Sequence, residues 1–315
     1  MPDERPSMPP DHTHSHSATP VKQQMDSHFL SNLLLALSCL VAAYVFLPRF
    51  APRLPELGRN SQYRLAISRI QITPPPHWVP HDLVDQVTKR AGLPTELSLL
   101  DEDLTQRVAR AFEQHPWVKG SVRVRTSVPA QLQVDLEYRE PVAMVRAKNG
   151  LFPIDVDAIV LPAADFSPAQ LTKYPVVENV GSQPSGPAGT QWRDVTVLGA
   201  ARLAALLKSH WQEFGLKSIR APASAEGGQT QVAWDELSFQ LGTRGGSRII
   251  WGRPPGSKRP GELPAEKKIE RMKYYLRQHG PFDSSLGPFE FDITHWCDIS
   301  RKPIAEQGAP ARRRS

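Results

Sequence analysis

The chain has 315 residues, of which 22% are charged, with a formal net charge of +6 and a pI near 9.4. This length exceeds the usual domain size of about 100–150 residues, so we expect two folded units with additional segments. The 31 prolines are about twice the usual share, which indicates that some segments are unstructured. The basic charge is spread out, and the clusters of basic and aromatic residues typical of nucleic-acid-binding proteins are absent from the sequence.

Residues 1–28 are predicted to form a disordered tail, and residues 29–47 a single transmembrane helix. The tail is rich in Pro, Ser and His and has too few large apolar side chains to offset the entropy lost on folding. A helix rises about 1.5 Å per residue, so the length of this apolar run as a helix nearly matches the thickness of a hydrocarbon core, about 30 Å. The sequence Leu47-Pro48-Arg49-Phe50 offers no signal-peptidase site, so we expect an uncleaved anchor.

The charge around this run and the size of the C-terminal part predict opposite orientations. Four arginines lie between Leu47 and Leu65, whereas two basic residues precede the run, so the positive-inside rule alone places the C-terminal part in the cytoplasm. The rule weakens when a large domain comes after the membrane segment, because such domains translocate largely regardless of charge.

After a linker at residues 48–62, residues 63–146 are predicted to form an α+β unit in the order β-α-α-β-β. The elements are a strand at 65–72, helices at 82–90 and 104–112, and a long hairpin between 118 and 138. Val122 and Val124 alternate with Arg123 and Arg125, the period of a half-buried strand. Pro129 suits the turn of the hairpin. Trp117 is interpreted as a core side chain at the junction of helix and hairpin.

This order and the residues at its junctions resemble the POTRA domain of the FtsQ/DivIB family of bacterial cell-division proteins. The resemblance is carried by the POTRA core and motif residues Pro116, Trp117, Val118, Val122, Arg123, Pro129, Leu132, Val134, Glu137, Arg139, Pro141, Val142 and Ala143. It implies a single-pass protein of the inner (plasma) membrane, with the N-terminus cytoplasmic and the bulk extracytoplasmic. It therefore favours translocation of the folded units over the orientation given by charge.

Residues 147–299 are expected to form a mixed β domain with flanking helices, before a disordered tail at 300–315. The segment 150–162 resembles the strand-turn-strand that opens the β domain of the FtsQ/DivIB family, with Ala158 where the family usually has glycine. Further expected elements are a proline-marked strand at 174–177, helices at 194–208 and 262–278, strands at 234–241 and 248–251, and a terminal strand at 289–296.

The motifs of enzymes are absent from the sequence, and we expect no catalytic residue, cofactor, metal site or small-molecule substrate. Asp155 and Asp157 are interpreted as turn residues rather than an acid-base pair. The glycine turn at 242–246 lacks the spacing of a phosphate-binding loop and its following Lys-Ser/Thr. The alternating histidines between 12 and 16 are a weak ligand set without a fixed backbone.

The final strand is the predicted interaction site, because a strand at the end of a sheet has unpaired N–H and C=O groups to which a partner strand can add. The resemblance implies FtsB-type partners, which pair with FtsL-type proteins. The implied partner-binding residues are Tyr274, Arg277, Phe289, Phe291, Ile293 and Trp296. An alternative interpretation is that the odd-numbered apolar residues of this strand face the core, which leaves the backbone and Trp296 for the partner.

The expected function is therefore that of a non-enzymatic divisome scaffold that recruits other division proteins to the septum. A different class, a POTRA-bearing chaperone or secretion component of outer-membrane assembly, would need several POTRA repeats or C-terminal amphipathic β-segments. Neither is visible in the sequence. A wall-modifying enzyme would need catalytic residues that the sequence does not display.

Overall fold

The computed structural model is a mixed α+β protein. It describes residues 27–50, 60–222, 233–296 and 298–304, and within the first of these ranges it describes the side chains of 31–46. The chain divides into two compact units, residues 1–57 and 58–315. The expected α+β class is confirmed, with helices and an eight-stranded mixed sheet.

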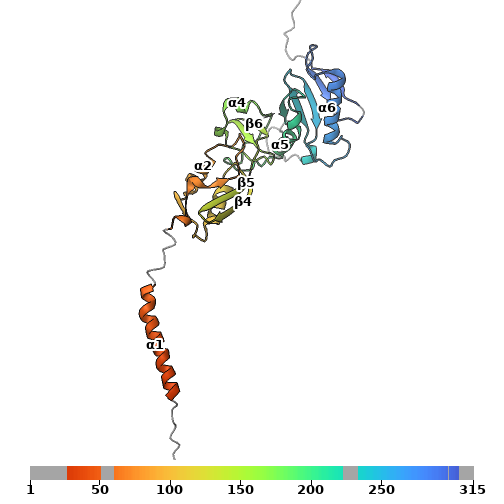
Figure 1. Ribbon diagram of the computed structural model, residues 1–315. Coiled ribbons are helices and arrows are strands. Elements are labelled where there is room, and N and C mark those ends of the chain that lie inside the picture. The colour runs from red at the N-terminus through yellow and green to blue at the C-terminus, as the bar shows by residue number, and fades with distance from the viewer. Residues whose placement is uncertain (1–26, 51–59, 223–232, 297, 305–315) are drawn as a thin grey trace, which may run out of the picture. The chain divides into compact units, whose positions relative to one another are not determined.

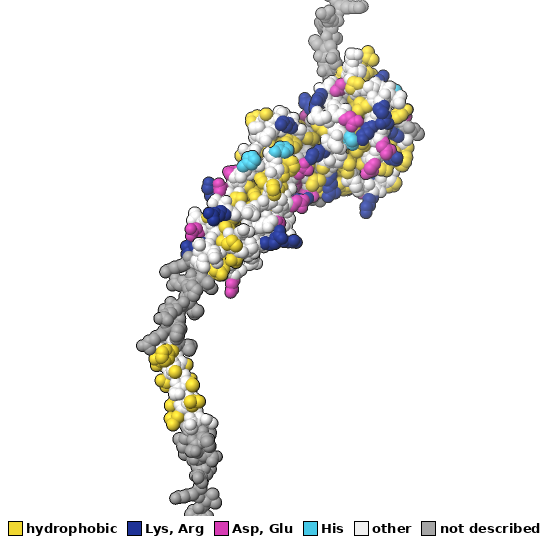
Figure 2. Space-filling model, viewed as in Figure 1, with side chains coloured by type: hydrophobic (Ala, Val, Ile, Leu, Met, Phe, Trp, Pro, Cys, Tyr) yellow, Lys and Arg dark blue, Asp and Glu magenta, His cyan; other side chains and the backbone are white. Residues whose placement is uncertain are grey.

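The first unit contains the helix α1 (Ser27–Phe50; Figure 1). Its large apolar side chains are exposed, including Leu35 at 67% and Leu40 at 68%, and Figure 2 shows them along the described part of the helix. Within the described ranges, none of the helices combines the length and the hydropathy that a membrane crossing requires. The span expected at 29–47 is therefore not confirmed.

The second unit begins with a small sheet covered by two helices. Its elements are β1 (Arg64–Ala66), β2 (Gln71–Ile72), α2 (Leu83–Ala91), β3 (Glu96–Ser98), α3 (Leu104–Glu113), β4 (Val118–Ser127) and β5 (Gln131–Tyr138). The strands β2, β5 and β4 form one sheet in that order, and β1 pairs with β3 in another. The observed order is β1-β2-α2-β3-α3-β4-β5, so the expected elements occur in the expected order, but with β1 added before them and β3 between the two helices. The strand expected at 65–72 is instead two short strands separated by a 3-10 turn at Ile67–Arg69.

The core of this part forms because each helix buries one apolar stripe against the hairpin. Helix α3 buries Leu104, Val108 and Phe112 at spacings of four residues, and α2 buries Leu83 and Val87 in the same way. These side chains form one cluster with the apolar face of β4 and β5. The helical pattern in the sequence therefore gives the observed packing.

The rest of the second unit is built on a sheet of eight strands. They are β6 (Ala143–Ala147), β7 (Gly150–Ile154), β8 (Val176–Glu178), β9 (Leu216–Arg220), β10 (Phe239–Thr243), β11 (Arg248–Gly252), β12 (Phe289–Asp292) and β13 (Ser300–Pro303). The spatial order is β13-β12-β11-β10-β9-β8-β6-β7, with parallel pairing of β11 with β12, β6 with β8, and β8 with β9. The connecting helices are α4 (Pro168–Leu171), α5 (Val195–Leu207) and α6 (Ala265–His279).

Helices α5 and α6 bury their apolar sides against this sheet (Figure 1). Gly199 of α5 lies so close to Phe239 that a Cβ at this position would come within 2.8 Å of the ring, which explains the glycine inside a helix. Tyr275 of α6 stacks on Phe282 at 5.1 Å and meets Phe291 of β12 edge-on at 5.2 Å. Aromatic packing thus fixes α6 over the strand β12.

Two polar contacts link the part of the unit that contains the three-stranded sheet to the segment that comes after β7. The Arg139 guanidinium lies 2.7 Å from Asp155, whose carboxylate is 2% exposed and also accepts from the main-chain N–H groups of Asp157 and Ile159. The Trp117 indole N–H donates to Asp165 at 2.7 Å. The motif residues Arg139 and Trp117 therefore hold the turns that come after β7, and Asp155 has a structural role.

Replacement of Asp155 by alanine is expected to lower the free energy of unfolding by about 3 kcal/mol, because it leaves a buried arginine and two N–H groups without their acceptor. Urea unfolding followed by tryptophan fluorescence measures the change. The control is Asp157→Ala, whose side chain makes no hydrogen bond among the described contacts and whose loss should change stability by less than about 0.5 kcal/mol. An equal decrease in the free energy of unfolding in the two variants would contradict the structural role of Asp155.

Candidate functional site

The two ends of the eight-stranded sheet differ in how much of their backbone is covered. At one end, the last residues of β7 are covered on their outer side by the chain that comes after them, with the N–H of Leu161 donating to Pro153 at 2.8 Å and a bridge between Ile154 and Val160. At the other end lies β13, with which no strand other than β12 pairs in the described part of the chain. The open edge of this sheet is therefore that of β13.

This result corrects the expectation that the strand at 289–296 ends the sheet. The strand β12 stops at Asp292, and β13 pairs with it antiparallel, from Phe289 opposite Pro303 to Asp292 opposite Ser300. The backbone edge of β12 is thus already occupied by the protein's own chain. Residues Ser300–Pro303, expected at the start of a disordered tail, form the actual edge strand.

The six expected partner-binding residues fall into two groups. Phe289, Phe291 and Ile293 are 9%, 1% and 0% exposed and belong to the core, as the alternative interpretation of the alternating pattern stated. The others lie on the surface: Trp296 is 63% exposed, Tyr274 is 57% exposed, and Arg277 is exposed on α6. The surface group remains accessible to a partner, whereas the core group is not.

The pairing of β12 with β13 shows which backbone groups point outward. The N–H of Ile304 donates to the carbonyl of Pro288 at 3.0 Å, so position 304 faces β12. Because successive residues of an antiparallel strand alternate in direction, Ser300 and Lys302 face β12 as well, whereas Arg301 and Pro303 face outward. The free edge therefore offers the N–H and C=O of Arg301 and the C=O of Pro303.

The side chains of β13 have the character of a protected edge. All four residues are exposed, two of them are basic, and the proline lies at an outward position where its missing N–H removes a donor. The Arg301 guanidinium lies 4.6 Å from the ring centre of Phe289 and covers this core side chain. Such an edge resists unspecific pairing, yet it keeps one donor and two acceptors for a matched strand.

The glycine turn between β10 and β11 is occupied by an internal carboxylate. Asp283 accepts from the Thr243 hydroxyl at 2.5 Å and from the N–H of Gly245 at 2.7 Å, with a longer contact to the N–H of Ser247 at 3.4 Å. A Cβ on Gly245 would come within 2.4 Å of Asp283, which explains the glycine. The N–H groups that a phosphate would need already have an acceptor, so the turn is a structural one.

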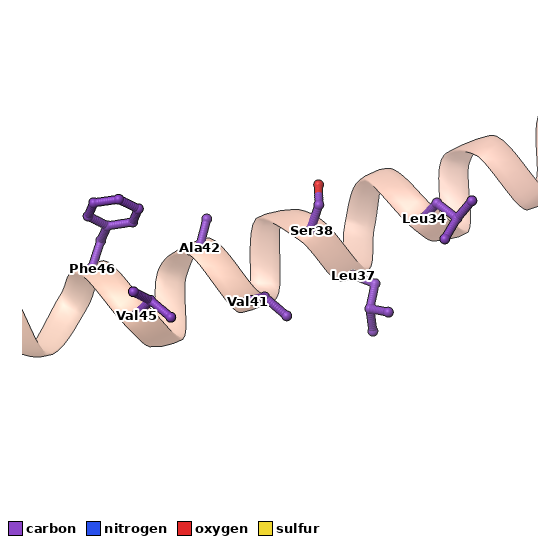
Figure 3. Close-up of a pocket in the computed structure, with 7 residues that line it drawn as sticks. All are labelled: Leu34, Leu37, Ser38, Val41, Ala42, Val45 and Phe46. Atoms are coloured by element: carbon purple, nitrogen blue, oxygen red, sulfur yellow. The ribbon is translucent and has the colours of Figure 1, made fainter.

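Two of the hollows in the described part of the molecule lie at its surface, and neither is an enclosed cavity. One runs along α1 and is lined by Leu34, Leu37, Ser38, Val41, Ala42, Val45 and Phe46 (Figure 3). All these side chains come from a single helix, so no second wall closes the hollow. The other lies over Gly242 and Ser218 on the sheet, where Glu178, Arg220 and Arg248 are near. Arg220 and Arg248 are already paired with Glu178 and Glu290.

The structure describes the candidate acidic pair of the sequence but not the candidate metal ligands. Among the described residues, no group of three or more His, Cys, Asp or Glu side chains is placed to hold a metal ion. The histidines between 12 and 16 lie outside the described residues. Asp155, the first member of the acidic pair, is engaged by Arg139 and two N–H groups.

No protein-family model matches the chain, and no curated protein is similar to it. The fold is that of a mixed α+β protein with a three-stranded sheet and an eight-stranded mixed sheet, in which β13 is the strand at one end. The resemblance to the FtsQ/DivIB family stays a prediction.

The bonds around Asp283 make the stability of the turn depend on pH. Burial raises the pKa of this carboxyl, but the hydrogen bonds from Thr243, Gly245 and Ser247 outweigh burial and hold the pKa below 3.8. A carboxyl with a lowered folded pKa contributes stability above its unfolded pKa and loses that contribution as the pH falls through the folded value.

We therefore expect Asp283→Asn to lower the free energy of unfolding by about 1 kcal/mol at pH 7. The difference from the wild type should shrink as the pH falls from 3.8 through the lower pKa of the folded state, because the Asp283 carboxyl is then protonated and neutral, like the asparagine side chain. Urea unfolding at a series of pH values measures it. In the control Asp103→Asn, which removes a carboxylate without a side-chain capping bond, we expect no such trend. A difference that does not change with pH would contradict the role of the charge.

Proposed function

We propose that this protein is a non-enzymatic cell-division scaffold of the FtsQ/DivIB type, which recruits partner division proteins to the septum by strand addition at the outer edge of β13. The observation that carries the proposal is the open edge itself. The strand β13 ends an eight-stranded sheet, all four of its residues are exposed, and Arg301 directs its N–H and C=O away from β12.

Three features of the described residues support this proposal beside the edge. The first is the order β2-α2-α3-β4-β5, which is the order of a POTRA domain. The motif residue Trp117 is buried between the end of α3 and the start of β4. The second is the eight-stranded mixed sheet that comes next in the chain, flanked by helices. The third is the surface near α6, where Tyr274, Arg277 and Trp296 are exposed and available to the side chains of an added strand.

Strand addition would use the two kinds of contact that such interfaces combine. Main-chain hydrogen bonds to Arg301 and Pro303 would supply affinity, and alternate side chains of the partner would select the sequence. The partner in this proposal is an FtsB-type protein paired with an FtsL-type protein. Because β12 is already paired on both sides, by β11 and β13, the partner adds one strand further out than the sequence indicates.

The proposal also includes attachment to the inner membrane through residues 29–47. It rests on the apolar sequence of this run and is supported by the exposure of its side chains, such as Leu34 at 64% and Leu37 at 58%. With the N-terminus cytoplasmic and the second unit extracytoplasmic, partners would meet β13 at the membrane surface. Confinement to two dimensions raises the effective concentration of both partners.

Replacement of Arg301 by proline is expected to lower co-purification of the FtsB-type partner at least about tenfold, which corresponds to about 1.4 kcal/mol. The proline removes the one outward N–H donor of β13 and leaves the bonds between β12 and β13 in place. The control is Arg301→Ala, which removes the same side chain and keeps the N–H. If the two variants retain the partner equally well, strand addition at β13 is wrong.

A fluorescent fusion to the N-terminus is expected to form a band at mid-cell during constriction. A diffuse or polar signal would contradict the proposed role at the septum. The orientation is tested separately, by fusing alkaline phosphatase after Ile304. This enzyme is active outside the cytoplasm, so an inactive fusion of normal abundance would place the second unit in the cytosol and would contradict the proposed topology.

A further inference from the structure

A single arginine of α6 binds the segment that joins β12 to β13. The Arg271 guanidinium donates through one nitrogen to the carbonyls of Ile293, at 3.4 Å, and His295, and through the other to the carbonyl of Trp296 at 2.9 Å. These carbonyls lie after the end of β12 and before β13. The contact therefore fixes the point at which the chain leaves the sheet and turns back along its edge.

The neighbouring side chains hold the start of the same segment but do not reach its end. Asp292 accepts from the N–H and the hydroxyl of Thr294 at 2.9 and 2.7 Å and lies 3.4 Å from His295. Among the described contacts, the carbonyl of Trp296 is bonded by Arg271. The arginine is thus the link between the helix, which is anchored in the core, and the exposed part of the connection.

The helix is a rigid base for this contact. One turn before Arg271, Lys268 is 2% exposed, donates to the carbonyl of Trp251 at 2.7 Å and pairs with Glu262. Met272 and Tyr275 are buried in the main core. Because α6 is anchored on both sides of Arg271, the backbone from which this side chain extends is held in place, and the guanidinium links it to the carbonyls after β12.

The chemistry requires an arginine rather than any cation. A guanidinium is planar and presents its N–H groups as a fork, so it can bind separate carbonyls at set angles, whereas an ammonium is a point donor on a flexible stem. Lysine at position 271 would keep the charge but not the geometry. A charge-only role and a geometric role therefore predict different results for Arg271→Lys.

We propose that Arg271 is a positioning residue for partner binding: it holds the β12–β13 connection so that the outer edge of β13 and the exposed Trp296 keep the arrangement that an added strand requires. Arg271 would act without touching the partner. The part of this inference that concerns binding rests on the proposed function, because it needs a partner that adds to β13. The other part, that Arg271 orders the edge, rests only on the hydrogen bonds of its guanidinium.

The test begins with hydrogen exchange of the full-length protein in detergent, without a partner. In Arg271→Met we expect the N–H groups of Lys302 and Ile304, which face β12, to exchange at least about tenfold faster. The N–H groups of Leu241 and Ile249 in the middle of the sheet should keep their rates. Arg271→Lys should resemble Arg271→Met. The matched control is Lys273→Met, which removes a cation of the same helix that has no partner among the described residues.

The second measurement is binding of the purified FtsB–FtsL-type pair to the same variants, with Arg301→Pro as the reference. Binding at least about tenfold weaker in Arg271→Met and Arg271→Lys, and unchanged in Lys273→Met, is the expected result. Full binding by Arg271→Lys would overturn the geometric role, and unchanged exchange at Lys302 and Ile304 would overturn the inference as a whole. If exchange rises while binding stays normal, the role in partner positioning is overturned.

The two measurements separate this inference from the proposed function. The exchange experiment uses no partner, so it tests the ordering of β13 even if the protein has no role in division. If Arg301→Pro binds the pair as well as the wild type does, the proposed strand addition fails, whatever the exchange rates of the Arg271 variants. If Arg301→Pro fails to bind and Arg271→Met binds normally, the proposed function stands and the positioning role is wrong.

Discussion

The open backbone edge at one end of the eight-stranded sheet is the constraint on which the interpretation of this protein depends. Every strand within a sheet pairs on two sides, and the strand at each end must leave one row of N–H and C=O groups to solvent or to another segment. Here one end is covered by residues 159–161 through the bond between Leu161 and Pro153, while the other end, β13, is not paired on its outer side in the described chain. The outer side of β13 therefore presents main-chain groups to which another strand can add.

The rest of the second unit serves to hold that edge in a defined place. The aromatic cluster of Tyr275, Phe282 and Phe291 packs α6 onto β12, so the helix and the next-to-last strand move as one body. The Arg271 guanidinium then binds the connection between β12 and β13 through the carbonyls of Ile293 and Trp296. At the other side, the Arg139–Asp155 pair joins the part that contains the three-stranded sheet to the turn after β7. Buried pairs of this kind add specificity of arrangement more surely than stability, because desolvation offsets much of their attraction.

The features of β13 are those by which proteins protect an open edge from pairing with arbitrary strands. Its charged side chains and its proline oppose pairing with an arbitrary strand, and its four residues are too few to template a long one. The same features make the edge selective. A strand that fits must offer one acceptor for the N–H of Arg301 and two N–H donors for the carbonyls of Arg301 and Pro303. An edge with these properties is suited to a scaffold that gathers specific partners rather than to a general binder of extended chains.

The sequence by itself determined the elements whose own side chains fix their structure. The apolar stripe Leu104, Val108, Phe112 gave α3, the alternation from Val118 to Tyr138 gave the hairpin of β4 and β5, and the regular spacing of Phe289, Phe291 and Ile293 correctly indicated a strand with a buried side. Only the tertiary structure decided where the sheet ends. Ser300–Pro303 has no apolar alternation, and it becomes a strand because β12 offers it backbone partners and Arg271 turns the chain toward them. Contacts between residues far apart in the chain also explain two other differences from the sequence prediction. The strand expected at 65–72 is split because its two parts pair with different strands, β3 and β5. Asp283 caps the glycine turn at Gly245 from a distant part of the chain, and local periodicity does not encode such contacts.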